Sequence, residues 1–522
     1  MFYPANFPKN KEPEFLALLH QWEDQFPKIS LKDSLSISRW QLRFVLERHK
    51  SEFQPKFYQQ LDKLLVKTRV RSWSGIVPVS VFTSGVGCPF NCVYCANEPN
   101  MPKSYFSDEP SVMRAIRNQF DPFKQVQSRL IMLYLSGHPL DKIELIIQGG
   151  TFSFYDQTYR ERFVQRCFDA ANTDVAELIR TGKTTISKSN NLLQAQTKNE
   201  TALQRIIGLT VETRPDFINK KEILFLRNLG VTRVEIGVQA PSEKILKLIN
   251  RGHGLKEIIK ATKLLKNAGI KVTYHLMPGL PGSSYSKDFK MLNEIFTNPN
   301  YKPDNIKFYP TSVVKYSQLE QWYKQGKYQP LDEKTLTKLV INFKKTIVPP
   351  WVRIQRLVRD LTVNDIIVNT FSSNLRQKIT QELKEQKIKC PCIRCREIKS
   401  DQKATKLKLE IINYEASCGQ EYFLQYVDNQ NRLYGLLRLR IFANQAIVRE
   451  LHVYGEVNPL GQRDKAKTQH AGLGQKLLQK AEQITKKQQI NKLAIISGIG
   501  ARGYYHRLGY RLENTYMVKS WQ

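Results

Sequence analysis

The chain has 522 residues, 41% of them hydrophobic, and this length favours two or three compact units with buried cores. Its 81 Lys and Arg against 47 Asp and Glu give a formal net charge of +34. So basic a chain favours a nucleic-acid partner, with a solvated lysine-rich surface as the alternative. No apolar run reaches the length of a membrane span, and the N-terminus lacks the apolar core of a signal peptide. We therefore expect a cytoplasmic protein with no membrane partner.

Residues 1–72 are predicted to form amphipathic helices in which Lys and Arg alternate with Trp40, Phe44, Phe53 and Phe57. This mixture suits contacts with a nucleic-acid backbone and stacking on unpaired bases. The alternative is a solvated charged face with no partner.

Between residues 73 and 360, short β-rich runs alternate with helix-like stretches. This alternation predicts an α/β fold, an open or partial (βα) barrel built from parallel strands. The polar segment Thr185–Gln204 is predicted to be an exposed insertion between two units. The predicted strands are Pro78–Thr83, Ile143–Gln148, Ile206–Glu212, Arg233–Val238, Ile270–His275 and Asn305–Tyr309.

The C-terminal part has a different pattern. Residues 361–404 form a basic linker, and residues 405–522 are predicted to form a mixed α+β domain. That domain begins with four successive strands and ends with a helix at Gln475–Gln489 and a last strand pair.

Six of the eight cysteines fall into two tight clusters, at residues 88–95 and 390–395, whereas Cys167 and Cys418 stand alone. In a reducing compartment, cysteines at ligand spacing indicate metal sites rather than disulfides.

The first cluster, Cys88, Cys92 and Cys95, directly follows the first predicted barrel strand, with Tyr94 before the third cysteine. Three thiolates on one loop can hold three irons of a [4Fe–4S] cube. The fourth iron is then free to bind the amino and carboxylate groups of S-adenosylmethionine. The competing interpretation is a structural zinc knuckle, which needs a fourth nearby ligand that the sequence does not show.

Further candidate ligands of S-adenosylmethionine lie at the ends of predicted barrel strands, where barrel active sites gather. Each has a plain alternative, a turn for the two glycines and a structural ion pair for the others. The candidates are Gly149, Gly150, Glu212, Arg214 and Gln239.

In the C-terminal domain, Gln469, Gly472 and Gly474 follow a strand and precede a helix in the spacing Q-x-x-G-x-G. Outward backbone N–H groups and a helix N-terminus there can bind a pyrophosphate. The spacing resembles the coenzyme A signature of the GNAT acyltransferases, and SGIGARGYYHRLGY, which contains Tyr504 and Tyr505, resembles the end of that fold. The alternative for Tyr505 is simple core packing.

The second cluster, Cys390, Cys392 and Cys395, is predicted to bind zinc, with Cys418 or a distant His as the missing fourth ligand. A second iron–sulfur cluster is the rival interpretation.

The motifs CPFNCVYC, DKIELIIQGGTF, VETRPD, EIGVQ, CIRCRE, RELHVYG and SGIGARGYYHRLGYR together resemble one family, the catalytic acetyltransferase subunit of Elongator and its prokaryotic homologues. The resemblance implies a radical S-adenosylmethionine domain joined to a GNAT-like domain, acting on the wobble uridine of tRNA, with or without Elongator-like subunits. It implies that Cys88, Cys92 and Cys95 hold the [4Fe–4S] cluster. It also implies contacts with acetyl-coenzyme A from Lys142, Glu450, Leu451, His452, Val453, Leu473, Gly474, Gln475 and Tyr505.

The resulting hypothesis makes Lys142, Glu212 and Tyr505 the catalytic candidates in the synthesis of 5-carboxymethyluridine. A radical removes hydrogen from the acetyl methyl group, the carbon adds to C5 of uridine, and thioester hydrolysis releases coenzyme A. The tRNA anticodon stem-loop is expected to contact residues 1–72 and the basic stretch Arg376–Arg396, with the wobble base out of its stack. Two alternatives stay open, a histone-type protein-lysine acetyltransferase with a structural iron–sulfur domain, and a non-enzymatic tRNA-binding scaffold.

Overall fold

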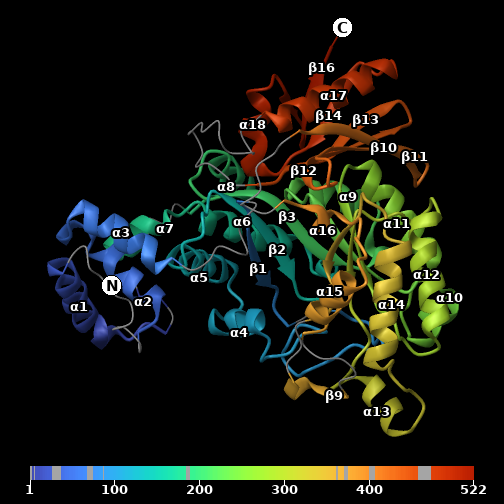
Figure 1. The fold of residues 1–522 in the computed structure, drawn as a ribbon, viewed down its shortest axis with the longest axis horizontal. Coiled ribbons are helices and arrows are strands. Elements are labelled where there is room, and N and C mark those ends of the chain that lie inside the picture. The colour runs from blue at the N-terminus through green and yellow to red at the C-terminus, as the bar shows by residue number, and fades with distance from the viewer. Residues whose placement is uncertain are drawn as a thin grey trace.

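The computed structural model describes the chain except residues 1–2, 5, 26–36, 67–74, 86–87, 184–187, 360–362, 369–373, 399–405, 456–471 and 522. An N-terminal helical lobe lies at one end, a curved parallel sheet with its helices forms the middle, and a second sheet lies against that barrel (Figure 1). No helix among the described residues is both long and apolar enough to cross a bilayer.

The N-terminal lobe consists of α1 (Glu12–Asp24), α2 (Arg39–Arg48) and α3 (Pro55–Leu65), with short 3-10 turns at Lys9–Lys11 and Lys50–Glu52. The helices were expected, but the proposed stacking of their aromatic rings on bases is wrong. Phe44, Phe53 and Phe57 are 0%, 6% and 1% exposed, and Trp40 packs against the same core. Amphipathic helices of this length must bury their apolar stripe to be stable, and these rings form that stripe.

The middle of the chain forms a seven-stranded parallel sheet in the order β1-β2-β3-β4-β5-β6-β8. Since β1 and β8 do not pair, the barrel is open on one side, which confirms the predicted partial (βα) barrel. The strands are β1 (Val77–Phe82), β2 (Lys142–Gln148), β3 (Arg205–Thr213), β4 (Arg233–Gln239), β5 (Lys271–Leu276), β6 (Asn305–Phe308) and β8 (Arg353–Arg356).

Helices cover the outside of this sheet (Figure 1). Alternate strand residues such as Val79 and Leu145 are completely buried, whereas Ser80 and Gln148 line a cavity inside the sheet. The helices of this part of the chain, of which α7 packs against the N-terminal lobe and α13 against β7, are α4 (Pro110–Arg117), α5 (Pro122–Leu135), α6 (Gln157–Ala171), α7 (Val175–Thr181), α8 (Leu192–Asn199), α9 (Lys220–Asn228), α10 (Glu243–Leu248), α11 (Leu255–Asn267), α12 (Tyr285–Thr297), α13 (Gln318–Lys324) and α14 (Glu333–Thr346).

The segment predicted as an exposed insertion, Thr185–Gln204, contains helix α8 (Leu192–Asn199), one face of which is buried while the other is exposed, and its residues 185–187 lie outside the described part. On the buried face, polar side chains satisfy backbone groups, and so their polarity is not a sign of exposure. The backbone N–H of Ile206 donates to Asn199 Oδ1 at 2.7 Å, and Asn199 is completely buried. Just beyond the helix, Glu200 pairs with Arg502 of the C-terminal domain at 2.8 Å.

The linker continues the barrel rather than standing apart from it. Strand β9 (Ile366–Val368) pairs antiparallel with β7 (Val313–Val314), and α15 (Leu375–Glu385) and α16 (Ile393–Arg396) follow. Leu375 and Ile379 are buried in the same hydrophobic cluster as the barrel strands.

The C-terminal domain is a seven-stranded mixed sheet in the order β10-β11-β12-β13-β14-β16-β15, as its predicted strands indicated. Its elements are β10 (Lys408–Ala416), β11 (Gly419–Val427), β12 (Leu433–Phe442), β13 (Gln445–Val453), α17 (Leu473–Lys487), β14 (Lys492–Ile496), α18 (Arg502–His506), β15 (Arg511–Glu513) and β16 (Tyr516–Ser520).

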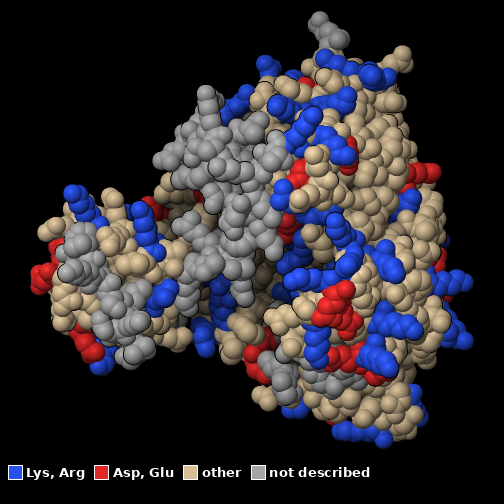
Figure 2. All heavy atoms as spheres, viewed as in Figure 1, with Lys and Arg blue, Asp and Glu red and all other residues tan. Residues whose placement is uncertain are grey.

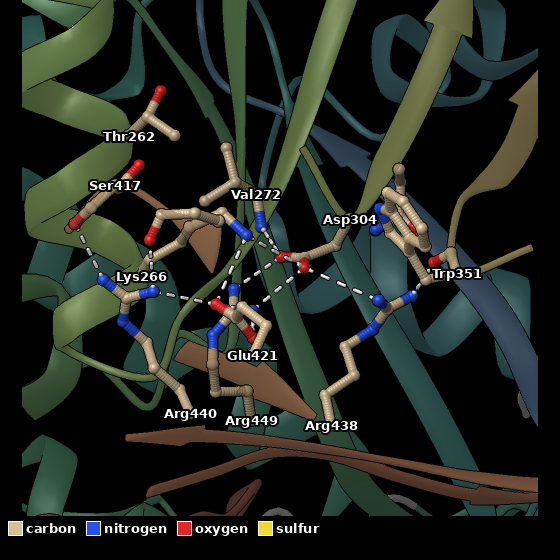
Figure 3. Close-up of polar contacts among 12 residues, drawn as sticks. Thr262, Lys266, Val272, Asp304, Trp351, Ser417, Glu421, Arg438, Arg440 and Arg449 are labelled. Atoms are coloured by element: carbon tan, nitrogen blue, oxygen red, sulfur yellow. Dashed lines mark hydrogen bonds and ion pairs between the residues drawn. The ribbon is translucent and has the colours of Figure 1, made fainter. Parts of the chain in front are cut away.

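A buried charge network joins the two domains (Figure 3). Arg449 of β13 pairs with Asp304, just before β6, and with Glu421 of β11 at 3.0 Å. Lys266 of α11 lies 3.5 Å from both carboxylates. Because Asp304 precedes its strand, the C-terminal sheet is docked at the amino ends of the barrel strands.

Candidate functional site

The first cysteine cluster lies on the loop after β1, at the carboxyl end of the parallel strands. Its backbone is fixed on two sides, because Val93 N donates to Ile249 O at 3.0 Å and Leu319 N donates to Val93 O at 2.8 Å. Burial, followed by the neighbouring Cys92 and Cys88, raises the pKa of Cys95 to about 12. A bound metal centre would therefore be needed to hold this sulfur as thiolate.

The two cysteine clusters differ in how closely their sulfur atoms approach. Among the described residues, the Sγ atoms of Cys390, Cys392 and Cys395 lie within 4.8 Å of one another, and the first triplet is not such a group. Sulfurs that share one tetrahedral ion must be close together, whereas sulfurs bound to different irons of a cube are farther apart. The first triplet thus fits a cube and the second fits a single ion.

Gly149 and Gly150 pass directly beside the first cluster. Both have positive φ, 128° and 99°, and a Cβ at Gly149 would lie 2.1 Å from Thr83 Oγ1. A Cβ at Gly150 would be 3.8 Å from the Cβ of Cys88. Only glycine gives this turn its shape, and it leaves the backbone open to a ligand at the cluster.

The other predicted S-adenosylmethionine ligands line the same cavity. The Arg214 guanidinium stacks on the Phe90 ring at 3.4 Å and pairs with Asp216 at 3.0 Å. Its Nη1 is buried without a hydrogen-bond partner among the described residues, which suits an anionic ligand group. Gln239 ends β4 with φ of 65° and also faces the cavity.

Glu212 accepts a hydrogen bond from Tyr105 Oη at 2.7 Å and lies 3.6 Å from Lys307 Nζ. Glu235 and His275, which sequence reasoning did not single out, lie beside it, and the three ligand atoms are within 4.8 Å of one another. The signal in the sequence that could have identified them is a titratable residue within a strand whose neighbouring positions are apolar. Arg251 was missed as well, although its Nη1 is 3.5 Å from Cys92 Sγ.

One cavity of about 1570 Å³ extends from these residues toward the C-terminal domain. It runs from the cysteines of the first cluster past Ser80 of β1 and Arg353 of β8 to Tyr454 and Gly455, just after β13. Eleven Lys and Arg line it against four Glu. Lys and Arg are also abundant on the face shown in Figure 2.

The second cysteine cluster borders the same cavity through Cys392 and Cys395. Lys344 Nζ lies 3.5 Å from Cys395 Sγ, and no fourth His, Cys, Asp or Glu joins the three thiols among the described residues. The suggestion of Cys418 is wrong, because this exposed residue sits in the turn between β10 and β11 outside the group.

The predicted coenzyme A residues gather where β13 and β14 separate. These strands pair only at Ile447–Ala494 and Val448–Ile495, and a bulge interrupts the pairing of β12 with β13 beside Arg449. The separated strands and the bulge leave backbone groups of β13 unpaired by the sheet.

Helix α17 begins beside this gap. Gly472 caps it with φ of 71°, and Gly474 is so close to Tyr504 that a Cβ would lie 3.0 Å from the Tyr504 hydroxyl. Leu451 and Val453 are the next nearest side chains to that position. Leu473 is buried, Tyr505 is 7% exposed in the core beneath, Gln475 lies in the first turn of the helix, and Gln469 lies outside the described residues.

Lys142, at the amino end of β2, belongs to the same region. Burial lowers the pKa of Lys142. Burial also lowers the pKa of His452 to about 3, and the nearby charge of Lys142 contributes to that shift. The His452 Nε2 has no partner among the described residues. Glu450 is already paired, with Lys271 at 3.0 Å and Arg438 at 2.8 Å, so its carboxylate is engaged within the protein.

Comparison with known proteins bears directly on these sites. The chain is 42% identical over 471 residues to the tRNA uridine(34) acetyltransferase of Dehalococcoides mccartyi (strain CBDB1), a match that covers 87% of this chain and 99% of the relative. It is 36% identical over 493 residues to Elongator complex protein 3 of Homo sapiens, covering 89% of this chain and 88% of that one. The chain belongs to this family.

Within the family architecture, residues 82–294 match the Radical SAM superfamily and residues 303–385 match the Radical_SAM C-terminal domain. The solved archaeal Methanocaldococcus infernus Elp3 with an N-terminus deletion (1-46) is 38% identical, with a TM-score of 0.73 over 86% of this chain and 99% of that chain. Membership of the radical SAM superfamily implies a [4Fe–4S] cluster and S-adenosylmethionine. Three cysteines on one loop, whose sulfur atoms do not all lie within 4.8 Å of one another, and the buried Arg214 Nη1, which has no partner among the described residues, fit that pair.

Proposed function

We propose that this enzyme modifies the wobble uridine of tRNA, using S-adenosylmethionine radical chemistry and acetyl-coenzyme A to form 5-carboxymethyluridine. The observation that carries the proposal is the single cavity that reaches from the cysteines of the first cluster to the end of β13. A relative named tRNA uridine(34) acetyltransferase, covered over 99% of its length, supports the choice of substrate.

At the carboxyl end of the barrel, Cys88, Cys92 and Cys95 would hold the [4Fe–4S] cluster, while Gly149, Gly150, Arg214 and Gln239 would bind S-adenosylmethionine. When bound, this pair supplies a carbon radical able to remove hydrogen from an unactivated methyl group. Glu212 is fixed by Tyr105 and Lys307, and so presents a carboxylate of constant orientation to the cofactor or the substrate.

At the amino end of the barrel, acetyl-coenzyme A would lie in the gap between β13 and β14. We assign its pyrophosphate to the start of α17, at Gly472, Leu473, Gly474 and Gln475, together with Gln469. Glu450, Leu451, His452 and Val453 would contact the pantetheine arm along the part of β13 that lies beyond its pairing with β14. Lys142 would contact the acetyl end, Tyr504 would form the wall of the groove, and Tyr505 would support Tyr504 from the core.

The basic lining of the cavity supports an anticodon stem-loop as the polyanion that enters it. Because Arg359 pairs with Glu109 and Arg396 is buried on backbone carbonyls, the freer Arg376 and Arg394 are better placed for phosphates. The wobble base would leave its stack to reach the cluster, as single-stranded bases in RNA loops readily do.

We also propose zinc at Cys390, Cys392 and Cys395, with a fourth ligand from outside the described residues or from solvent. The cytoplasm would be the setting, since all eight cysteines are free and a reducing compartment keeps them so. Elemental analysis of the chain and of Cys395→Ser tests the metal. Loss of about one zinc per chain is expected, and iron lost in its place would indicate a second iron–sulfur cluster.

Nucleoside mass spectrometry decides the proposed function. The purified, cluster-reconstituted chain is incubated with S-adenosylmethionine, a reductant, acetyl-coenzyme A and a tRNA transcript with U34. Carboxymethyluridine at position 34 is expected, and it should be absent when C34 replaces U34. Acetyl-lysine on added histone peptide with unmodified tRNA would indicate a protein acetyltransferase, and tRNA binding without either product would indicate a scaffold.

A further inference from the structure

Three charged or titratable side chains, from Glu235, His275 and Lys307, meet inside the barrel, and the first two line the same cavity as the first cluster. Glu235 of β4 is 1% exposed, and its Oε2 accepts a hydrogen bond from His275 Nε2 of β5 at 2.8 Å. Lys307 Nζ of β6 contacts the same oxygen and lies 3.6 Å from Glu212 Oε1. Glu212, Glu235 and His275 line the cavity described above.

A metal ion is one possible occupant of this group, because Glu212, Glu235 and His275 lie within 4.8 Å of one another. The Lys307 ammonium argues against it. It already lies between the two carboxylates and supplies the positive charge that a cation would bring. The ammonium of Lys307 therefore balances negative charge of Glu212 and Glu235 without a metal ion.

The arrangement fixes which ring nitrogen of His275 donates to Glu235. Burial alone would raise the pKa of Glu235, but Lys307, His275 and Arg233 hold it well below its usual range. The carboxylate is thus ionised and can only accept, so His275 Nε2 must donate. In the neutral ring Nδ1 then has the free lone pair, and no described residue forms a hydrogen bond with it.

The neighbouring groups are not free to act as bases. Glu212 is held by Tyr105 and Lys307, and the aromatic edge of Tyr309 packs against the His275 ring at 5.4 Å. The side chain of His275 is 16% exposed, toward the cavity. A carboxylate behind a histidine with one free ring nitrogen is a common arrangement of an acid–base pair.

The proposed function requires such a group. When the methyl carbon bonds to C5 of uracil, the C5–H bond must break and its proton needs an acceptor. The hydrogen atom from the methyl group ends up in 5′-deoxyadenosine. Cleavage of S-adenosylmethionine to methionine consumes one electron, and the uracil adduct returns one electron when its C5 proton leaves. One proton remains, and resting on that function we propose that Nδ1 of His275 accepts it, with Glu235 as the positioning residue.

The test uses His275→Gln, whose amide can still donate to Glu235 but cannot take up a proton. Transcripts carry U34 with hydrogen or deuterium at C5, and carboxymethyluridine and 5′-deoxyadenosine are measured together. General acid–base catalysis typically contributes about 10²–10⁴-fold, so product formation should fall at least about 100-fold. Release of 5′-deoxyadenosine and the dissociation constant of S-adenosylmethionine should stay within about twofold of wild type. The isotope effect at C5 should increase.

Two further variants keep the result interpretable. Product formation by His275→Ala should recover in part with added imidazole, and Glu235→Gln should lower the product while keeping the cofactor affinity. His20→Gln in the N-terminal lobe is the control for a His-to-Gln change. Unchanged product in His275→Gln, or a loss explained by weaker cofactor binding, overturns the role of His275. Wild-type chain that makes no carboxymethyluridine overturns the proposed function itself and this step with it.

Discussion

Arg449 Nη2 of β13 lies 2.5 Å from Asp304 Oδ2, across the boundary between the C-terminal sheet and the barrel. Both side chains are completely buried, and Glu421, Lys266 and Arg440 complete the network around them. Charges removed from water must be paired with good geometry, so this network allows one relative placement of the two domains. That placement keeps β13 against the amino ends of the barrel strands.

Asp304→Asn is expected to destabilise the chain by about 3–5 kcal/mol, because it leaves buried Arg449 and Lys266 short of one negative charge. Thermal unfolding and urea titration measure the change. The matched control is Glu14→Gln, which breaks the solvent-exposed Lys11–Glu14 pair and should cost less than about 1 kcal/mol. Equal effects of the two variants would mean that the network contributes nothing beyond a surface pair.

The same network predicts a loss of stability in acid. Burial would raise the pKa of Asp304 and Glu421, but Arg449 and Lys266 hold both below their usual values. Their contribution is therefore fully present above the unfolded pKa values of about 4 and is lost as pH falls below them. The melting temperature of wild type should drop steeply below about pH 4, whereas that of Asp304→Asn should fall less steeply.

The barrel could be predicted from the sequence because its strands are short apolar runs separated by helical stretches. The run Arg233–Val238 became β4 (Arg233–Gln239), and Ile143–Gln148 became β2 with one added residue. The sequence also placed the first three cysteines at a strand end. Parallel strands bring their carboxyl ends together, and so local spacing was enough there.

Features that depend on distant partners could not be predicted in this way. Asp304 and Arg449 are 145 positions apart, and each alone looks like a surface charge. Asn199 looks like a loop residue until its bonds to Ile206 and Asn172 are known. The interior group of Glu235, His275 and Lys307 comes from three strands, and only their register brings it together.

Cys92→Ser should abolish the iron–sulfur absorbance and lower the iron content, because two remaining thiolates cannot hold a cube. Carboxymethyluridine should disappear as well, while the C-terminal domain stays folded. Cys418→Ser is the matched control, since this exposed cysteine belongs to neither cluster. Full product from reconstituted Cys92→Ser protein would exclude the radical assignment.

Gly474→Ala should raise the KM for acetyl-coenzyme A several-fold without lowering the melting temperature. The new Cβ would lie 3.0 Å from the Tyr504 hydroxyl and narrow the groove, whereas alanine is the better helix former. Adding Tyr504→Phe to this variant should restore part of the affinity. Gly503→Ala is the matched control, because nothing lies within 4 Å of its added Cβ. If both alanine variants gave the same KM, the groove beside α17 would not bind coenzyme A.

The binding of tRNA should depend strongly on salt, and the Arg residues of the cavity should account for part of that dependence. Each lost phosphate contact reduces the slope of log affinity against log salt by about 1. Arg376→Gln and Arg394→Gln together should therefore reduce it by about 2, with similar weakening for any tRNA sequence. Lys263→Gln, an exposed charge on α11, is the control.

The N-terminal lobe is tested in the same way with Lys56→Gln and Lys63→Gln together. These exposed charges of α3 are groups of the lobe that can contact phosphates, whereas its aromatic rings are buried. An unchanged slope in the Arg376 and Arg394 variant but a reduced one in the Lys56 and Lys63 variant would place the phosphate contacts on the N-terminal lobe rather than in the cavity.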